Sequence, residues 1–328
     1  MINDKNGNDK NGKKKKSLAK IDSLTFFYFT LLTFVFITSS ALALSRFNEK
    51  PIVIREKIEL MSFTPIPELS DSSNFPILSA QAALAVDIDS GISLYEKNPN
   101  TPLLPASTTK IITALVAMDN YLLETNLTVG KFWVEGQKMG LREGEKIRVD
   151  DLLQGLLIFS ANDAAEVLAL NYPGGRSAFI DAMNEKARTL SLENSNFKNP
   201  TGLDGNGHSS TARDLVRVSE VAMRNKKFAQ IVATKEKSVT SVDGKIAHKL
   251  INLNELVGKV EGVLGVKTGW TEVARENLVT YIERDGHRVM IALLGSQDRF
   301  GETEELISWI FENYEWQEVS LPQGNYSP

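Results

Sequence analysis

The sequence predicts an α/β fold of the α+β type, in which a mainly antiparallel sheet is flanked by helices and carries a mostly helical insertion. Strand-like apolar runs occur near both ends of the part that can fold, at 82–95 and at 263–294. The residues between these two regions show mainly helical periodicity. One sheet assembled from the two ends of the chain, with helices between its strands, would bury an apolar face of each element.

Five short runs supply the expected strands, and two pairs of them form hairpins. Asp89-Ser90-Gly91 separates the first pair and Asp285-Gly286 joins the last pair, which are connections typical of antiparallel neighbours. The runs are 82–88, 92–95, 263–267, 277–282 and 289–294. The two hairpins enclose the helical region in the sequence.

The expected helices have apolar residues at helical spacing. One begins at Ser107. A second begins at Val149 and ends at Ser160-Ala161-Asn162-Asp163, where serine, asparagine and aspartate are natural capping residues. Another begins again at Ala164. Two further helices are expected at 178–190 and at 302–314.

The composition is that of a globular protein without thiol chemistry. The chain has 328 residues, 42% of them apolar, which allows one large domain or two smaller ones. It has no cysteine, so disulfides, thiolate metal sites and cysteine nucleophiles are excluded. His208, His248 and His287 are too scattered to predict a metal cluster, and we expect each at the surface or in a turn. No cofactor is expected.

Charge divides the chain unevenly. Residues 1–22 carry a local charge of +4, and because the whole chain is −4 the remainder is −8. An acidic body argues against nucleic acid as a partner, since phosphate binding requires the opposite sign. Residues 1–22 have almost no apolar content and are predicted to be a basic cytoplasmic tail.

Residues 23–44 carry no charge and are apolar over a length that can cross a bilayer. The preceding lysines place the amino end inside, so the folded part is expected on the extracytoplasmic side. Ala41-Leu42-Ala43 also fits a signal-peptidase site, which leaves cleavage after Ala43 as the alternative to a retained single-pass anchor. The length of the segment favours the anchor.

The remaining boundaries follow from composition. Residues 45–78 contain four prolines without a sustained period and are predicted to be a linker. A single folded domain is expected over 79–318, with a short tail at 319–328. Because little chain follows Tyr314, no second domain is expected after this one, and residues 23–44 are expected to be the only attachment to the membrane.

Ser107 and Lys110 are the first candidate chemical pair. A serine three residues before a lysine at the start of a helix lies on the same helix face, where the amine can accept the hydroxyl proton. The same spacing occurs at Ser17 and Lys20 and at Ser195 and Lys198. The spacing alone therefore does not identify a nucleophile.

Two further elements occur in order, Ser160-Ala161-Asn162 and Lys267-Thr268-Gly269. Ser-x-x-Lys, Ser-x-Asn and Lys-Thr-Gly together are the set found in serine β-lactamases and penicillin-binding proteins. Four longer runs, at 160–165, 197–203, 210–214 and 265–269, resemble the D-alanyl-D-alanine carboxypeptidases, the low-molecular-mass penicillin-binding proteins of peptidase family S11. The resemblance covers about 82–314 and implies a β-lactamase/DD-peptidase-like fold.

The resemblance implies a serine-type peptidase that removes the terminal D-alanine from peptidoglycan stem pentapeptides through an acyl-enzyme on Ser107. Penicillins and other β-lactam antibiotics would then be covalent inhibitors. Lys110 would be the base, provided that burial and a neighbouring cation, which the resemblance identifies as Lys267, lower its pKa. Ser160 would complete the proton relay to the leaving amine. Asn162 would bind the substrate backbone or hold Lys110.

The resemblance also implies how the end of the substrate is recognised. Lys267 and Thr268 would face the free carboxylate, and Gly269 would leave room for a peptide lying along the strand edge. Backbone N–H groups of Ser107 and Trp270 would form the oxyanion hole. The residues implied for substrate binding are Asn162, Lys267, Thr268, Gly269, Trp270, Arg299 and Arg213, the last two at the rim and Arg299 as a second contact to the carboxylate.

One departure and two rival functions stay open. Arg275 stands where the family usually has a glycine, which could narrow the site, add a substrate contact or reflect a shifted turn. A serine β-lactamase shares the three elements, and Glu185 and Glu193 lie in the region of its catalytic glutamate, although no loop motif of that class is present. A penicillin-acylated wall-binding or sensor module with poor turnover is the second rival, supported only by Arg275.

Overall fold

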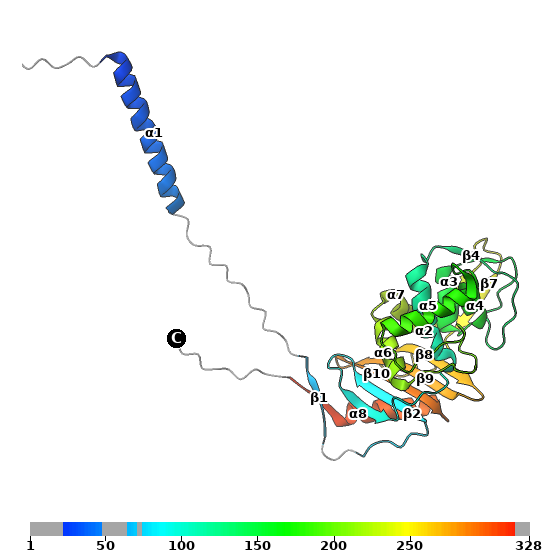
Figure 1. The fold of residues 1–328 in the computed structure, drawn as a ribbon. Coiled ribbons are helices and arrows are strands. Elements are labelled where there is room, and N and C mark those ends of the chain that lie inside the picture. The colour runs from blue at the N-terminus through cyan, green and yellow to red at the C-terminus, as the bar shows by residue number, and fades with distance from the viewer. Residues whose placement is uncertain (1–21, 48–63, 71–73, 319–328) are drawn as a thin grey trace, which may run out of the picture. The chain divides into compact units, whose positions relative to one another are not determined.

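The computed structural model describes residues 22–47, 64–70 and 74–318, in two compact units divided between Ser62 and Phe63 (Figure 1). The first unit contains one described helix, α1 (Ser23–Phe47). Its part from Ser23 to Leu42 is long and apolar enough to cross a membrane. The predictions for residues 1–21, 48–63 and 319–328 fall outside the described residues.

The second unit is built on a five-stranded antiparallel sheet with the order β3-β2-β10-β9-β8. Both predicted hairpins, β2–β3 and β9–β10, are confirmed. The two ends of the chain meet where β2 pairs with β10, as predicted. The strands are β2 (Ala82–Asp87), β3 (Ser93–Lys97), β8 (Val263–Thr271), β9 (Arg275–Arg284) and β10 (His287–Ser296).

A mostly helical insertion lies between β3 and β8. It begins with a single 3₁₀ turn, Ala106–Thr109. The helices are α2 (Lys110–Asn120), α3 (Val149–Ile158), α4 (Asn162–Leu170), α5 (Gly175–Thr189), α6 (Ala212–Met223) and α7 (Lys226–Val232). Two small hairpins that the sequence did not predict accompany them, β4 (Asn126–Thr128) with β5 (Lys146–Arg148) and β6 (Glu236–Thr240) with β7 (Ala247–Ile251).

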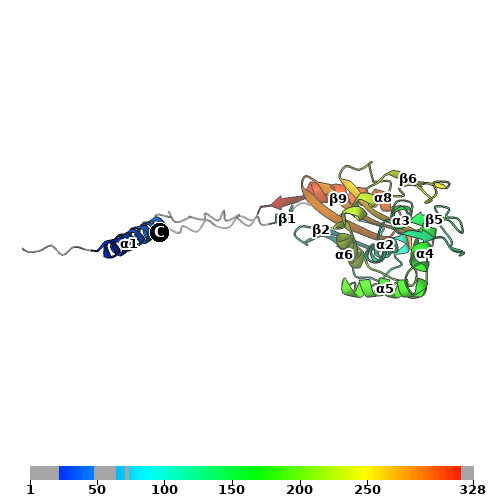
Figure 2. The same ribbon diagram turned by 90° about the horizontal axis from the view of Figure 1, so that it is seen from above.

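The sheet buries both of its faces. Along β10, Met290 and Ala292 pack into the apolar cluster that contains α2 and α6, whereas Ile291 and Leu293 pack with Leu306 of α8 (Arg299–Asn313). Successive strand residues point to opposite faces, so a continuous apolar run supplies both layers. Figures 1 and 2 show α8 on one side of the sheet and α2 and α6 on the other.

Several boundaries differ from those expected, among them the starts of α2 at Lys110 rather than Ser107 and of α5 at Gly175 rather than 178. β1 (Ile66–Leu69), inside the predicted linker, pairs with β11 (Tyr314–Gln317), so the folded unit begins before residue 79. Helix α4 begins at Asn162 rather than at Ala164, and Ala161 before it makes no capping side-chain bond. Helix α8 begins at Arg299 rather than at 302, with Asp298 as its cap. Short pairings and helix starts depend on tertiary contacts that local periodicity does not encode.

Candidate active site

The turn that carries Ser107 is held between two glycines. A side chain at Gly269 of β8 would lie 3.1 Å from the Ser107 nitrogen, and one at Gly202 would lie 1.9 Å from the carbonyl oxygen of Ala106. Gly202 also has a φ of +86°, which L side chains rarely adopt. The two glycines therefore allow β8 and the 197–203 loop to close on the Ser107 backbone.

Lys110, at the start of α2, is fully buried, and its Nζ lies within hydrogen-bond distance of three oxygens. The side-chain oxygen of Asn162 and the carbonyl oxygen of Thr201, each at 2.6 Å, can only accept hydrogen bonds. The third oxygen is Ser107 Oγ at 2.9 Å. A neutral amine has two protons, which these two acceptors take. Its lone pair is then left for the Ser107 hydroxyl.

The electrostatics of the site favour that neutral amine. Burial lowers the pKa of Lys110 well below its usual value of 10.5, and the charge of Lys267 lowers it further, while Asp163 acts in the opposite direction. Burial, followed by the charge of Arg299, lowers the pKa of Lys267 from 10.5 to about 7. The charged form of each lysine is thus disfavoured by burial and by a neighbouring basic group, Lys267 for Lys110 and Arg299 for Lys267.

Ser160 and Asn162 lie at the junction of α3 and α4. Ser160 has a φ of +59° and is almost fully buried, facing the same cleft as Ser107. The Asn162 side chain accepts from Lys110 and donates to the carbonyl oxygen of Glu135 at 2.7 Å, and the Asn162 backbone N–H donates to the carbonyl oxygen of Gln137 at 2.7 Å. The Asn162 amide is therefore fixed in the orientation that presents its oxygen to Lys110.

A cleft of about 690 Å³ contains most of the predicted site. Lys267 lies buried beside it, with Nζ donating to the carbonyl oxygen of Thr268 at 3.0 Å. Arg299 Nη1 donates to the carbonyl oxygen of Gly269 at 3.1 Å, which joins α8 to β8. The predicted residues that line the cleft are Ser107, Ser160, Asn162, Thr268, Gly269, Trp270 and Arg299.

Arg213 does not lie at this cleft, which corrects the prediction that placed it at the rim. Its guanidinium donates to Glu96 at 2.9 Å and to Asn100 at 2.8 Å. Glu96 belongs to β3, the edge of the sheet opposite to β8. The physical reason is that α6 begins beside β3, so the first turn of the helix directs Arg213 to the far edge.

Comparison with known proteins agrees with this geometry. A family model described as D-alanyl-D-alanine carboxypeptidase matches residues 70–298. The chain belongs to the D-alanyl-D-alanine carboxypeptidase family. Its fold is also that of solved relatives. The crystal structure of the Streptomyces K15 DD-transpeptidase superposes with a TM-score of 0.70 and is 31% identical in sequence. The match covers 73% of this chain and 100% of the transpeptidase chain.

Curated members of the family carry two kinds of name. A D-alanyl-D-alanine carboxypeptidase of Mycobacterium tuberculosis is 36% identical over 242 residues, which cover 71% of this chain and 82% of the relative. A D-alanyl-D-alanine carboxypeptidase of Bacillus subtilis is 31% identical, and the match covers 72% of this chain and 63% of that protein. A D-alanyl-D-alanine endopeptidase of Pseudomonas aeruginosa is 34% identical, and the match covers 71% of this chain and 77% of that protein.

In this member of the carboxypeptidase family His208 and His248 are buried, which corrects the expectation that they lie at the surface. His208 accepts from the backbone N–H of Lys198 at its Nδ1, 3.1 Å away, and contacts Thr109 Oγ1 through Nε2 at 2.9 Å. Burial, with the charge of Lys198, lowers the pKa of His208 to about 4, so the ring is neutral and supports the turn next to Ser107. His248 is likewise buried. In the sequence, the glycine-rich stretch just before His208 was the only local feature that could have indicated a special environment for this histidine.

Proposed function

We propose that this chain is a serine-type D-Ala-D-Ala carboxypeptidase that removes the terminal D-alanine from peptidoglycan stem pentapeptides. The observation that carries the proposal is the Lys110 amine, whose two acceptors leave its lone pair for Ser107 Oγ. Family membership supports the same reaction. The mechanism needs no metal, because a positioned amine performs the proton transfer.

In the acylation step, Ser107 Oγ attacks the carbonyl carbon of the D-Ala-D-Ala bond and its proton passes to Lys110 Nζ. The backbone N–H groups of Ser107 and Trp270 receive the developing oxyanion. The C–N bond then breaks, and the D-alanine amine leaves with a proton passed from Lys110 through Ser160. Water attacks the Ser107 ester and releases the shortened peptide, and its proton returns by the same route to Ser107.

The substrate end would be recognised by the cationic part of the cleft. Lys267, Thr268 and Arg299 would receive the free carboxylate of the terminal D-alanine. In the described sheet β8 pairs with β9 on one side and has no neighbour on the other, so the peptide can add as a further strand. β-Lactam antibiotics would enter by the same route and acylate Ser107.

The described geometry does not favour the β-lactamase alternative. Glu185 is exposed and pairs with Arg188 on α5, and Glu193 is also exposed. Neither residue lines the cleft that contains Ser107. Neither of these two glutamates is therefore placed to activate water at the Ser107 ester, as the loop glutamate of class A enzymes does.

The cellular location forms part of the proposal. Helix α1 would serve as a retained single-pass anchor that holds the catalytic domain on the extracytoplasmic side, and the alternative is a signal segment cleaved after Ala43. Its length and uncharged sequence support the anchor. Recovery of the full-length chain in washed membranes, with an intact amino-terminal tag, is the expected result. Release of a shortened chain would establish cleavage.

The proposed reaction is tested by Ser107→Ala. We expect it to abolish both D-alanine release from diacetyl-Lys-D-Ala-D-Ala and covalent labelling by a fluorescent penicillin, because the ester is formed on Ser107 Oγ. Ser195→Ala is the matched control, since Ser195 has the same spacing to a lysine but bonds to Asp214. Retained D-alanine release by Ser107→Ala would overturn the mechanism. Labelling of the wild type without D-alanine release would favour the sensor alternative.

A further inference from the structure

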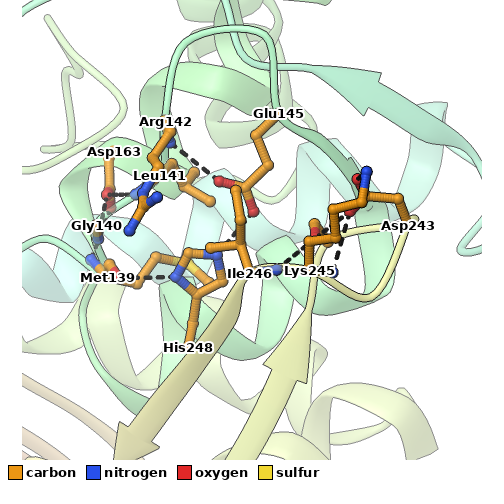
Figure 3. Close-up of polar contacts among 11 residues, drawn as sticks. Met139, Gly140, Leu141, Arg142, Glu145, Asp163, Asp243, Lys245, Ile246 and His248 are labelled. Atoms are coloured by element: carbon orange, nitrogen blue, oxygen red, sulfur yellow. Dashed lines mark hydrogen bonds and ion pairs between the residues drawn. The ribbon is translucent and has the colours of Figure 1, made fainter.

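His248 on β7 is buried between two acceptors (Figure 3). Its Nδ1 lies 3.0 Å from the carbonyl oxygen of Met139, and its Nε2 lies 2.7 Å from Glu145 Oε1. The side chains of His248 and Glu145 are only 3% and 0% exposed. Glu145 also accepts from the backbone N–H of Arg142 through its other oxygen, at 3.0 Å. The pair is therefore sealed from water.

The number of protons in this contact follows from the partners. A carbonyl oxygen only accepts, so Nδ1 of His248 carries a hydrogen. A carboxylate also only accepts, so a further proton must lie between Nε2 and Glu145 Oε1. Whether that proton is bonded to Nε2 or to Oε1, the contact is a second hydrogen bond of the ring. It fixes the His248 ring, and with it the Nδ1–H that points at Met139.

A continuous path leads from Met139 to the catalytic amine. The backbone N–H groups of residues 139–141 donate to the Asp163 carboxylate at 3.0, 2.9 and 3.0 Å (Figure 3). Asp163 directly follows Asn162, whose side chain holds Lys110. The carbonyl groups of 135 and 137 bind the same asparagine. The segment 135–141 thus wraps the first turn of α4.

This segment needs support from outside itself. Between Thr128 and Lys146, all within the described residues, the chain forms no helix or strand. Its conformation therefore depends on tertiary hydrogen bonds and packing rather than on a regular ladder. On one side it is held by Asp163, and on the other by His248 from the separate β6–β7 hairpin.

We propose that His248 is a positioning residue for the acylation reaction, which acts by holding the carbonyl group of Met139 and so fixes segment 135–141 against Asn162 and Lys110. The inference rests on the proposed function, because it concerns the geometry of the same proton transfer. The carboxylate-binding residues lie on β8 and α8, outside this path. Residues 135–137 of the segment also line the cleft beside Ser107, so loss of the His248 bond should act more strongly on the rate of the chemical step than on substrate binding.

Two substitutions separate the two bonds of the ring. The amide nitrogen of asparagine occupies nearly the place of Nδ1, and that of glutamine nearly the place of Nε2. We expect His248→Gln to lower kcat for D-alanine release, and the rate of acylation by a fluorescent penicillin, by about 10- to 100-fold, as displacements of about 1 Å do. His248→Asn should keep the bond to Met139 and lose less than about 3-fold. KM should change less than kcat in both, because the expected contacts to the substrate carboxylate lie on β8 and α8.

The rates are expressed per active site titrated with penicillin, so that a loss of folded protein does not count as a loss of rate. His287→Gln is the matched control, because His287 stacks on Trp316 at the far hairpin. Equal rates for His248→Gln, His248→Asn and the wild type would overturn the inference, as would an equal fall in both variants or a change confined to KM. A wild type that neither labels nor releases D-alanine would instead overturn the proposed function.

A measurement on the wild type covers the case in which the variants do not fold. With ¹⁵N-labelled histidine, Nδ1 of His248 should be protonated at pH 7.5, whereas Nδ1 of His208, which accepts from Lys198 N–H, should not. His208 is thus an internal reference in the same spectrum. An unprotonated Nδ1 at His248 would overturn the inference without any variant.

Discussion

Replacing Lys267 by methionine should make the protein more stable while it weakens the site. Lys267 is 2% exposed, and its pKa falls from 10.5 to about 7 on folding because burial and then Arg299 disfavour the charged form. Below about pH 7 both the folded and the unfolded states carry the charge, and the folded state bears the full penalty. Between pH 7 and 10.5 only the unfolded state is protonated, so the penalty shrinks as the pH rises, and it is absent above 10.5.

The magnitude follows from that difference. A pKa unit corresponds to about 1.4 kcal/mol, so the penalty is about 5 kcal/mol at low pH. The methionine variant lacks the hydrogen bond from Lys267 Nζ to the carbonyl oxygen of Thr268, and this loss offsets about 1 kcal/mol of the gain in stability. Lys267→Met should therefore raise the free energy of unfolding at pH 6.5 by about 3 to 4 kcal/mol. At pH 9.5 the gain should be smaller by about 3 kcal/mol.

The assay is urea unfolding followed by circular dichroism from pH 6.5 to 9.5, for the wild type and the variant side by side. Lys237→Met is the matched control, because Lys237 is exposed on β6. Its free energy of unfolding should differ from that of the wild type by the same amount at pH 6.5 and at pH 9.5. KM for the peptide should rise in Lys267→Met, because the proposed contact of Lys267 to the substrate carboxylate is lost. A variant less stable than the wild type at pH 6.5, or a difference independent of pH, would refute the reasoning.

Two other predictions test the Ser107 turn and the base. Gly202→Ala should reduce penicillin labelling and lower the free energy of unfolding by about 3 kcal/mol or more, because the added Cβ would overlap the carbonyl oxygen of Ala106. Gly244 has a similar φ of +72° but open space around it, so Gly244→Ala should lower the free energy of unfolding by only about 1 to 2 kcal/mol. Equal losses would show that the close approach to the Ser107 turn is unimportant. The acylation rate should fall as the pH drops through the lowered pKa of Lys110, because a protonated amine cannot accept the Ser107 proton. A rate that stays constant down to pH 4 would exclude Lys110 as the base.

The sheet and the three chemical elements could be predicted because their signals are local. Asp285-Gly286 between two apolar runs specifies a hairpin by turn chemistry alone, and β9–β10 has that turn. Ser107 and Lys110 are three residues apart, so their contact follows from helical geometry. The order of the three elements then indicated serine β-lactamases and penicillin-binding proteins, and the four longer runs narrowed the resemblance to the carboxypeptidase family.

The supporting contacts could not be predicted, because they join residues far apart in the sequence. His248 meets Glu145 and Met139 from a hairpin about a hundred residues later in the chain, and no motif marks that pairing. The error for Arg213 has the same origin. The motif that contains it was correct for the family, but only the path of α6 shows that its side chain faces Glu96 on the far edge of the sheet.

Arg275 shows how a departure from the family can be absorbed by the backbone. It is the first residue of β9, pairs with Thr271 and has a φ of +59°, the left-handed region in which glycine is unstrained. Its side chain is exposed and is not among the residues that line the cleft, so the arginine does not narrow the groove beside Ser107. An L side chain in this conformation costs about 1 to 2 kcal/mol. This strain and the larger free-energy penalty of burying Lys267 both arise at the edge of the sheet beside the site. The apolar layers on the two faces of the sheet stabilise the fold and so compensate for both costs.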